Sequence, residues 1–240
     1  MKSMETKRIL LIGNSYTYYN DLYLMYENIL KEKNIKAKVE TFTYGGAFLT
    51  DFISGGKYNN EFISFLKTRH FDYVIIQEQS LRPLTDYDNF LLGAREIKEL
   101  LKTYNPNIKL FLYETWARHI NSDFYKDNKI DYHTATYTLA DNYKNVGNTV
   151  GAIVIFVGLG FYKMCNEYKE IKLYQDDYSH PTPRGSYLAS LLLARATFNI
   201  NPLEVNYLPS FKIDIDEYDK RQPNKKEANI IKKIASEIDY

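Results

Sequence analysis

A serine and a histidine far apart in the chain have surroundings that suit nucleophilic catalysis. Ser15 follows the apolar run "RILLIG" (8–13), and His180 lies in "DDYSHPTPRG", three residues after Asp177. A general base needs one ring nitrogen directed at the nucleophile and the other held by an acceptor. Asp177 can be that acceptor, because the turn it shares with His180 is stiffened by two prolines.

Each of these residues also has an ordinary structural interpretation. Ser15, between a strand and a helix, has the residue type and position of a helix N-cap. His180 can equally be a loop histidine beside a helix-capping acid. A phosphate-binding loop is a third interpretation of the first stretch, but "GNSYTYYN" lacks the Walker Gly-Lys-Ser/Thr and a second glycine.

The other histidines have weaker surroundings for catalysis. His70 precedes a predicted strand, so we expect it at the sheet edge opposite the site. His119 lies in the polar loop 115–131 with no acid at a fixed spacing, and this loop is a candidate lid or partner surface. His133 begins a predicted helix and fits a surface or capping role.

Composition limits the class of protein. The chain has 240 residues, of which 45% are hydrophobic and 25% charged, with a net charge of +1. This charge does not favour a nucleic-acid partner. The single cysteine, Cys165, excludes an intrachain disulfide and a cysteine-cluster metal site. We expect a cytoplasmic protein, because we find neither a signal peptide nor a segment of the roughly 20 apolar residues that span a membrane.

Short apolar runs alternate with longer segments of helical periodicity. Runs of this length are typical of strands buried on both faces of a parallel sheet. The predicted strands are 8–13, 37–45, 72–77, 108–114 and 151–158, and the predicted helices are 21–33, 59–68, 88–104, 131–146, 184–198 and 224–238. The alternation predicts an α/β fold with a doubly wound parallel sheet. We expect a single domain over 1–240, with a core at about 8–198 and a C-terminal extension at about 199–240.

In such a sheet, ligands bind beyond the carboxyl ends of the strands. The residues that follow the predicted strands are small, polar or amide-bearing, and they should gather at one edge. They are Gly13-Asn14-Ser15, Gly45-Gly46-Ala47, Gln77-Glu78-Gln79-Ser80, Glu114-Thr115-Trp116 and Gly158.

Taken together, four stretches resemble the SGNH hydrolases, or GDSL-type esterases. They are "GNSYT", "YGGAF", the amide-rich "IIQEQS" and "DYSHP". The resemblance covers about residues 8–198 and implies a flavodoxin-like three-layer α/β/α sandwich with a five-stranded parallel sheet. It also implies that Ser15 is the nucleophile, His180 the general base and Asp177 the residue that orients it. The backbone N–H groups of Ser15 and Gly46 would form the oxyanion hole.

The third stretch departs from the family pattern, in which an asparagine side chain donates to the oxyanion. This chain has glutamines there, as in a divergent bacterial subgroup with "GNS" in its first block. A glutamine carries the same amide on a longer stem, so Gln77 or Gln79 can replace the asparagine, and Gln77, next to the strand, is the first choice.

The resemblance implies acyl transfer without a metal or cofactor, on a small-molecule ester such as an O-acetylated carbohydrate. Gln79, Glu78 and Trp116 are candidate substrate contacts, although Trp116 is as readily a packed aromatic and Glu78 a solvated loop acid. A lipase-like or thioesterase activity and a carbohydrate-binding protein without turnover remain alternatives. A nucleotide- or flavin-binding protein is the least favoured, and the oligomeric state is left open.

Overall fold

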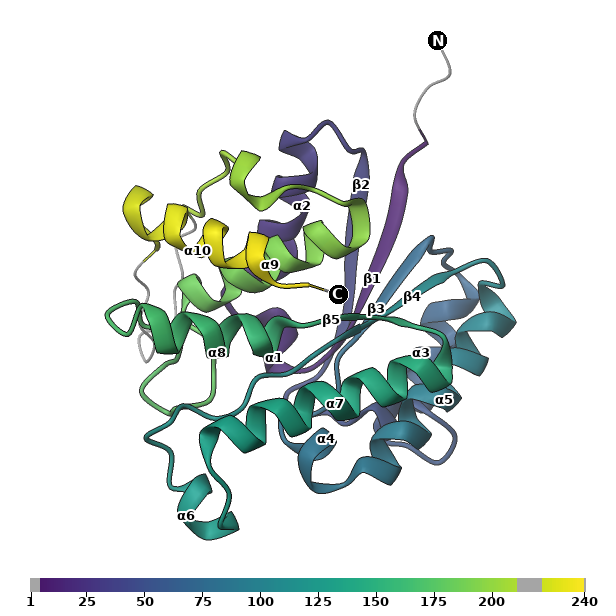
Figure 1. Ribbon diagram of the computed structural model, residues 1–240. Helices are drawn as coiled ribbons and strands as arrows, with labels where there is room; N and C mark the ends of the chain where they lie inside the picture. The colour runs from purple at the N-terminus through teal and green to yellow at the C-terminus, as the bar shows by residue number, and fades with distance from the viewer. Residues whose placement is uncertain (1–4, 211–221, 240) are drawn as a thin grey trace.

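The computed structural model describes residues 5–210 and 222–239, and its centre is a parallel five-stranded sheet (Figure 1). The strand order is β2-β1-β3-β4-β5, which is the flavodoxin-like order. The predicted fold class is therefore confirmed. The strands are β1 (Lys7–Gly13), β2 (Ala37–Thr43), β3 (Tyr73–Ile76), β4 (Lys109–Tyr113) and β5 (Ile153–Ile155).

Helices cover both faces of the sheet, which explains the continuous apolar character of the strands. Ile9 and Leu11 of β1 face one core cluster, and Leu10 and Ile12 face the other. Successive side chains of a strand point to opposite faces, so both faces must be apolar when both are covered. The first face carries α2 (Leu22–Glu32), α8 (Val157–Glu167), α9 (Pro183–Phe198) and α10 (Lys225–Glu237); the second carries α3 (Asn59–Lys67), α5 (Tyr87–Tyr104) and α7 (Tyr132–Val150) (Figure 1).

The register of the central strands aligns the loops that build the site. Gly13 at the end of β1 pairs with Thr43 of β2, and Ile12 pairs with Ile76 of β3. The chain therefore leaves β1, β2 and β3 at one level, where the loops that follow these strands meet.

The predicted strand at 151–158 is too long. β5 ends at Ile155, and the new helix α8 begins at Val157. The apolar run continues past the strand because Val157 and Gly158 are buried in the first turn of α8. Periodicity also missed the short helices α1 (Ser15–Tyr18), α4 (Arg82–Thr85) and α6 (Phe124–Asn128), and the 3₁₀ turns η1 (Tyr19–Asp21), η2 (Leu49–Phe52) and η3 (Pro202–Glu204).

The C-terminal helix packs against the rest of the chain. Ile231 and Ile234 of α10 belong to the same core cluster as Ile9 of β1, and Arg184 of α9 pairs with Glu227 at 3.1 Å. The division into a core and an extension stays a prediction, and residues 211–221 of that extension lie outside the described residues. Within the described residues, no helix combines the length and the apolar character needed to cross a membrane.

Candidate active site

Ser15 occupies the first helical position of α1, directly after β1. The N-cap is Asn14, whose side-chain oxygen accepts the backbone N–H of Tyr16 at 3.2 Å. The Asn14 amide also donates to the carbonyl oxygen of Ala47 at 3.0 Å, which ties the first loop to the second. The interpretation of Ser15 as the helix cap is therefore wrong, and its hydroxyl is not used to cap the helix.

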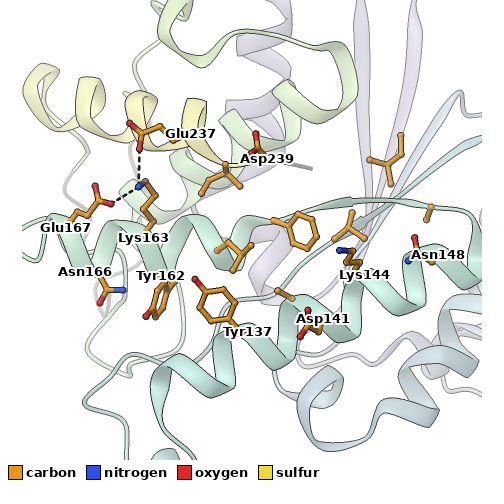
Figure 2. Close-up of a pocket in the computed structure, with 17 residues that line it drawn as sticks. Tyr137, Asp141, Lys144, Asn148, Tyr162, Lys163, Asn166, Glu167, Glu237 and Asp239 are labelled. Carbon is orange, nitrogen blue, oxygen red and sulfur yellow. Dashed lines mark hydrogen bonds and ion pairs between the residues drawn. The ribbon is translucent and has the colours of Figure 1, made fainter.

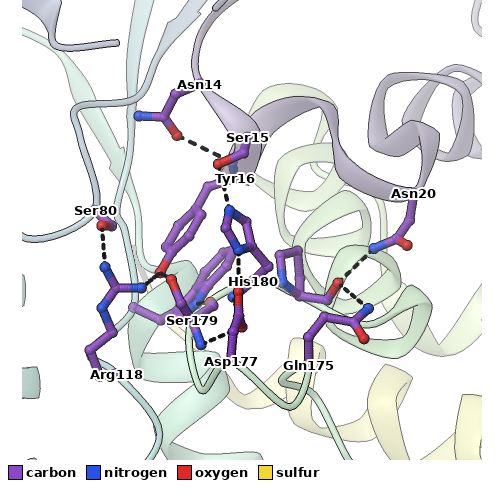
Figure 3. Close-up of polar contacts among 12 residues, drawn as sticks. Asn14, Ser15, Tyr16, Asn20, Ser80, Arg118, Gln175, Asp177, Ser179 and His180 are labelled. Carbon is purple, nitrogen blue, oxygen red and sulfur yellow. Dashed lines mark hydrogen bonds and ion pairs between the residues drawn. The ribbon is translucent and has the colours of Figure 1, made fainter. Parts of the chain in front are cut away.

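The structure brings Ser15, His180 and Asp177 together in one line of hydrogen bonds (Figure 3). His180 Nε2 lies 2.9 Å from Ser15 Oγ, and His180 Nδ1 lies 2.5 Å from Asp177 Oδ2. Because a carboxylate only accepts, Asp177 favours the tautomer with its proton on Nδ1, which leaves Nε2 free to accept from the serine. This is the geometry of an activated nucleophile.

Asp177 is itself held by the turn that carries His180. Its Oδ1 accepts the backbone N–H groups of Ser179 and His180, each at 2.9 Å. Partial burial alone would raise the pKa of Asp177, but hydrogen bonds from the His180 ring and from these two N–H groups lower the pKa to about 2. Asp177 is therefore ionised at neutral pH and fixed in orientation.

Neighbouring loops brace the turn that carries His180. The backbone N–H of Gln175 donates to the carbonyl oxygen of His180 at 2.8 Å. The Ser179 hydroxyl lies 2.9 Å from the Tyr16 hydroxyl, and the Ser179 carbonyl accepts the Trp116 indole N–H at 2.9 Å. The position of the histidine is thus set by segments on both sides of it.

Of the two interpretations of Trp116, a substrate contact and a packed aromatic residue, the structure supports the second. Its side chain is only 1% exposed and lies between the rings of Tyr16 and Phe161, with centroid distances of 4.1 and 4.0 Å. Both stacks are close to parallel, so the indole is closed off on both faces. Trp116 is a packed aromatic residue beneath the site.

A cavity of about 220 Å³ opens beside the Ser15 hydroxyl. Gly46 lies in its wall with φ +67, a left-handed conformation that favours glycine, and a Cβ there would meet nothing within 4 Å. The residues lining the cavity are Asn14, Ser15, Tyr16, Gly46, Gln79, Ser80, Arg118, Ser179 and His180. The structure thus brings Gly46 into the same cavity as Ser15 and His180.

Gln77, the first choice for the side-chain donor to the oxyanion, does not line this cavity. It is 1% exposed, and its Oε1 accepts the Asn14 backbone N–H at 3.2 Å and the Thr17 hydroxyl at 2.7 Å. It lies against Gly13, where a Cβ would come within 2.6 Å of the same oxygen. The assignment of Gln77 to the oxyanion hole is corrected: the side chain is committed to holding α1 on β1.

Gln79 is the glutamine that faces the cavity. Its Oε1 accepts the backbone N–H groups of Leu81 and Arg82, at 3.0 and 3.1 Å. These bonds fix which end of the amide is nitrogen, and that nitrogen donates to Ser80 Oγ at 3.2 Å. An amide nitrogen carries two hydrogens, so the bond to Ser80 leaves one of them unused.

Two buried carboxyl groups hold the loops around the site. Glu78 is fully buried, and its Oε1 accepts the backbone N–H groups of Leu49 and Gln79 at 3.1 and 2.6 Å. Both interpretations of Glu78, as a substrate contact and as a solvated loop acid, are therefore wrong. Burial raises the pKa of Glu78 to about 7. Glu114, at the end of β4, accepts the Leu159 N–H at 3.1 Å, and burial raises its pKa to about 8.

Arg118 and Ser80 belong to the cavity wall. Ser80 was expected at this edge of the sheet, whereas Arg118 was not among the predicted site residues. Arg118 Nη2 donates to Ser80 Oγ at 3.2 Å, and Nη1 donates to the Tyr16 hydroxyl at 3.1 Å (Figure 3). Arg118 follows β4 by five residues, inside a loop whose course no periodicity predicts. The feature of the sequence that could have identified Arg118 as a site residue is its position in the loop just after a strand.

The remaining histidines lie outside this cavity. His119 stacks on Tyr178, with ring centroids 5.2 Å apart, and its backbone N–H donates to the Tyr178 carbonyl. His133 Nδ1 lies 2.8 Å from the Tyr162 hydroxyl on the α7–α8 side. His70 precedes β3 and so lies at the other edge of the sheet.

A more voluminous hollow, of about 1060 Å³, lies between α7, α8 and α10 (Figure 2). It contains the Lys163–Glu167 and Lys163–Glu237 ion pairs, at 2.6 and 3.2 Å. Among the described residues that line it there is no serine, cysteine or histidine. Volume alone therefore does not select the cavity that Ser15 and His180 line.

Comparison with known proteins finds its matches among solved structures. No protein-family model matches the sequence, and no curated protein matches it. A Slackia heliotrinireducens protein assigned to the SGNH hydrolases is 25% identical, with a TM-score of 0.69 over 80% of this chain and 99% of that one. A DUF4886 family protein from Bacteroides uniformis is 17% identical, with a TM-score of 0.78 over 97% and 94% of the two chains.

The lipase/acylhydrolase of Enterococcus faecalis is similar at 17% identity, with a TM-score of 0.57 over 79% of this chain and 94% of that one. These matches, each over 79% or more of this chain, show a shared overall fold. The chain has the SGNH hydrolase fold.

Proposed function

We propose that this protein is a serine ester hydrolase of the SGNH type. The observation that carries the proposal is the line from Asp177 through His180 to Ser15, with Nε2 of the histidine 2.9 Å from the serine oxygen. An inactive binding protein has no need of this arrangement. The solved neighbours described as SGNH, lipase and acylhydrolase proteins support the same class of reaction.

Acylation follows from the positions of these groups. Ser15 Oγ attacks the ester carbonyl carbon while His180 Nε2 takes the serine proton. Asp177 keeps the Nδ1 proton in its hydrogen bond and stabilises the imidazolium that forms. As the tetrahedral intermediate collapses, His180 returns the proton to the leaving alcohol oxygen, and the acyl group stays on Ser15.

The oxyanion needs donors on the cavity side of Ser15. The backbone N–H of Ser15, in the first turn of α1, has no partner within that helix, and Gly46 can offer its N–H from the facing wall. We assign the side-chain donor to Gln79, because its amide nitrogen is oriented and it lines the cavity. In characterised enzymes one such donor contributes on the order of 10²–10³ in turnover.

Deacylation repeats the sequence with water in place of the serine. His180 takes a proton from a water molecule that attacks the acyl carbon, the oxyanion forms again, and Ser15 leaves with the proton returned from His180. The acid is released and the enzyme is restored, with every proton passing through one ring nitrogen.

The cavity supports a small acyl ester as substrate. Its volume of about 220 Å³ is below the roughly 300–1,000 Å³ of sites that enclose drug-sized ligands. This size favours an acetyl-like group over a long chain, so the small-ester proposal is preferred to the lipase-like one. An O-acetylated carbohydrate remains within the proposal, but Trp116 no longer supports it, because its ring is buried.

Labelling and turnover test the proposal together. A fluorophosphonate probe should label the wild type on Ser15, and Ser15→Ala should abolish both labelling and hydrolysis of p-nitrophenyl acetate. Ser64→Ala, at an exposed position of α3, is the matched control and should keep both. Full activity in Ser15→Ala, or a wild type that neither labels nor hydrolyses any short ester, would contradict the proposal.

A further inference from the structure

A guanidinium group without a carboxylate partner lies in the wall of the Ser15 cavity. Arg118 donates to the Tyr16 and Ser80 hydroxyls, and both partners are neutral. Within the part of the chain that the structure describes, it forms no ion pair with an acid at 4.0 Å or less. Asp177, the acid of this site, is committed to the His180 ring and to two backbone N–H groups.

Arg118 is also the one permanently charged side chain among the described residues that line the cavity. The other lining groups are neutral hydroxyls, amides and a glycine, together with the titratable His180. A cation that is partly removed from water and lacks a counter-ion favours an anion beside it. The cavity therefore presents a positive charge beside the nucleophile.

The loop holds Arg118 in place before any ligand arrives. The Tyr125 hydroxyl donates to the Arg118 carbonyl oxygen, and the Tyr174 hydroxyl donates to that of Ala117 at 2.9 Å. Trp116, two residues earlier, is buried between two rings. These contacts fix the backbone at Arg118, and the Tyr16 and Ser80 hydroxyls hold its guanidinium. The side chain therefore has less entropy to lose when it meets an anion, and this preorganisation favours bidentate binding of a carboxylate.

We propose that Arg118 makes this site selective for small esters that carry a carboxylate within a few atoms of the ester group. The proposal rests on the proposed hydrolase function and names its substrate class. The short separation follows from the 220 Å³ cavity, which contains both Arg118 and the Ser15–His180 pair. The guanidinium binds the carboxylate oxygens while the carbonyl carbon lies against Ser15.

The kinetic test uses acetoxyacetate and acetoxyacetamide, which have the same acyl group and nearly the same size but differ in charge. A hydrogen bond to a charged group contributes about 10- to 100-fold, so wild-type kcat/KM should favour acetoxyacetate by this factor. In Arg118→Met the ratio of the two kcat/KM values should fall to about one. Arg118→Lys keeps the positive charge but lacks the planar guanidinium that binds a carboxylate through two hydrogen bonds. Its ratio of kcat/KM values should lie between those of the wild type and Arg118→Met.

Arg95→Met is the matched control for net charge, because Arg95 is exposed on α5. Its ratio should equal that of the wild type. A wild-type ratio near one overturns the proposal. An unchanged ratio in Arg118→Met, with both esters slowed equally, overturns it too and makes Arg118 a donor to the oxyanion instead.

A binding measurement separates this proposal from the hydrolase function. Calorimetry on Ser15→Ala should show acetoxyacetate binding about 10- to 100-fold tighter than acetoxyacetamide, and adding Arg118→Met should remove the difference. Equal affinities in Ser15→Ala overturn the carboxylate site. If the wild type hydrolyses neither these esters nor p-nitrophenyl acetate, the hydrolase function fails, and the calorimetric preference alone decides whether the anion site exists.

Discussion

The rings of Trp116 and Tyr16 lie parallel, with centroids 4.1 Å apart and 4° between their planes. This stack joins the loop after β4 to the helix that carries Ser15. The indole N–H reaches across to the Ser179 carbonyl, next to His180. One buried side chain therefore contacts the immediate chain neighbours of both Ser15 and His180.

Replacing Trp116 should loosen both contacts. Trp116→Ala should lower the free energy of unfolding by about 3–5 kcal/mol, the usual cost of truncating a large buried aromatic residue. Trp116→Phe keeps a stacked ring and loses one hydrogen bond, which costs about 1 kcal/mol. Urea denaturation followed by circular dichroism measures both, and equal stability of Trp116→Ala and the wild type would contradict the packing role.

Asp177→Asn should lower kcat without unfolding the protein. An asparagine amide facing His180 Nδ1 donates instead of accepting, which selects the tautomer that cannot receive the serine proton. Turnover should fall by on the order of 10²–10⁴. Asp176→Asn is the matched control, because the Asp176 side chain is fully exposed. Stopped assays on p-nitrophenyl acetate compare the turnover of the two variants. Similar losses in both variants would argue against an orienting role for Asp177.

Gly46→Ala should damage the site more than the fold. Its φ of +67 makes any side chain strained, at about 1–2 kcal/mol, although a Cβ would meet nothing within 4 Å. Gly55, with φ +81 and equally open surroundings, is the control. Both alanine variants should lose similar thermal stability, whereas only Gly46→Ala should also lose kcat as the backbone N–H moves. An unchanged kcat in Gly46→Ala would remove this N–H from the oxyanion hole.

Substitutions of the two glutamines should have different effects: Gln77→Leu should lower stability, and Gln79→Leu should lower turnover. Gln77→Leu leaves the Asn14 N–H and the Thr17 hydroxyl without an acceptor in the core. Each buried group without a partner should lower the free energy of unfolding by about 1–3 kcal/mol. Gln79→Leu should reduce kcat by on the order of 10²-fold if its amide donates to the oxyanion. Thermal denaturation and steady-state kinetics on both variants give the comparison. A large loss of kcat in a Gln77→Leu variant that is as stable as the wild type would support Gln77, not Gln79, as the side-chain donor to the oxyanion.

Stability should decrease as pH rises from about 5 to 8. Burial raises the pKa of Glu78 to about 7 and that of Glu114 to about 8, whereas each ionises near 4.5 in the unfolded chain. In this window the unfolded chain has released protons that the folded chain retains, so raising the pH favours unfolding. Each group contributes a slope of up to about 1.4 kcal/mol per pH unit.

Urea midpoints at pH 5.5, 6.5, 7.5 and 8.5 measure this slope. Glu114→Gln should reduce the slope to the part that Glu78 contributes, because the amide cannot ionise and can still accept the Leu159 N–H. Asp177, with its pKa lowered to about 2, contributes stability that is lost only under more acidic conditions. A midpoint that rises with pH in the wild type would show that the buried carboxyl groups are ionised in the folded state.

The sequence by itself determined the sheet and was sufficient to single out the three residues that the structure joins by hydrogen bonds, Asp177, His180 and Ser15. Apolar runs such as 8–13 are long enough and uniform enough to specify strands buried on both faces, and the predicted fold was confirmed. Asp177 and His180 are three residues apart on one turn, so a local pattern was sufficient to suggest their pairing. Ser15 was placed by its position at the end of a predicted strand.

Only the tertiary structure decided which neighbours of these residues face the cavity. Gln77 and Gln79 are two residues apart and chemically identical, and what separates them is the packing of Gln77 beneath Gly13 and Thr17. Trp116 and Arg118 follow the same strand, yet the first is closed between two rings and the second lines the cavity. Strand periodicity fixes where a loop begins, but contacts between distant segments fix where its side chains point.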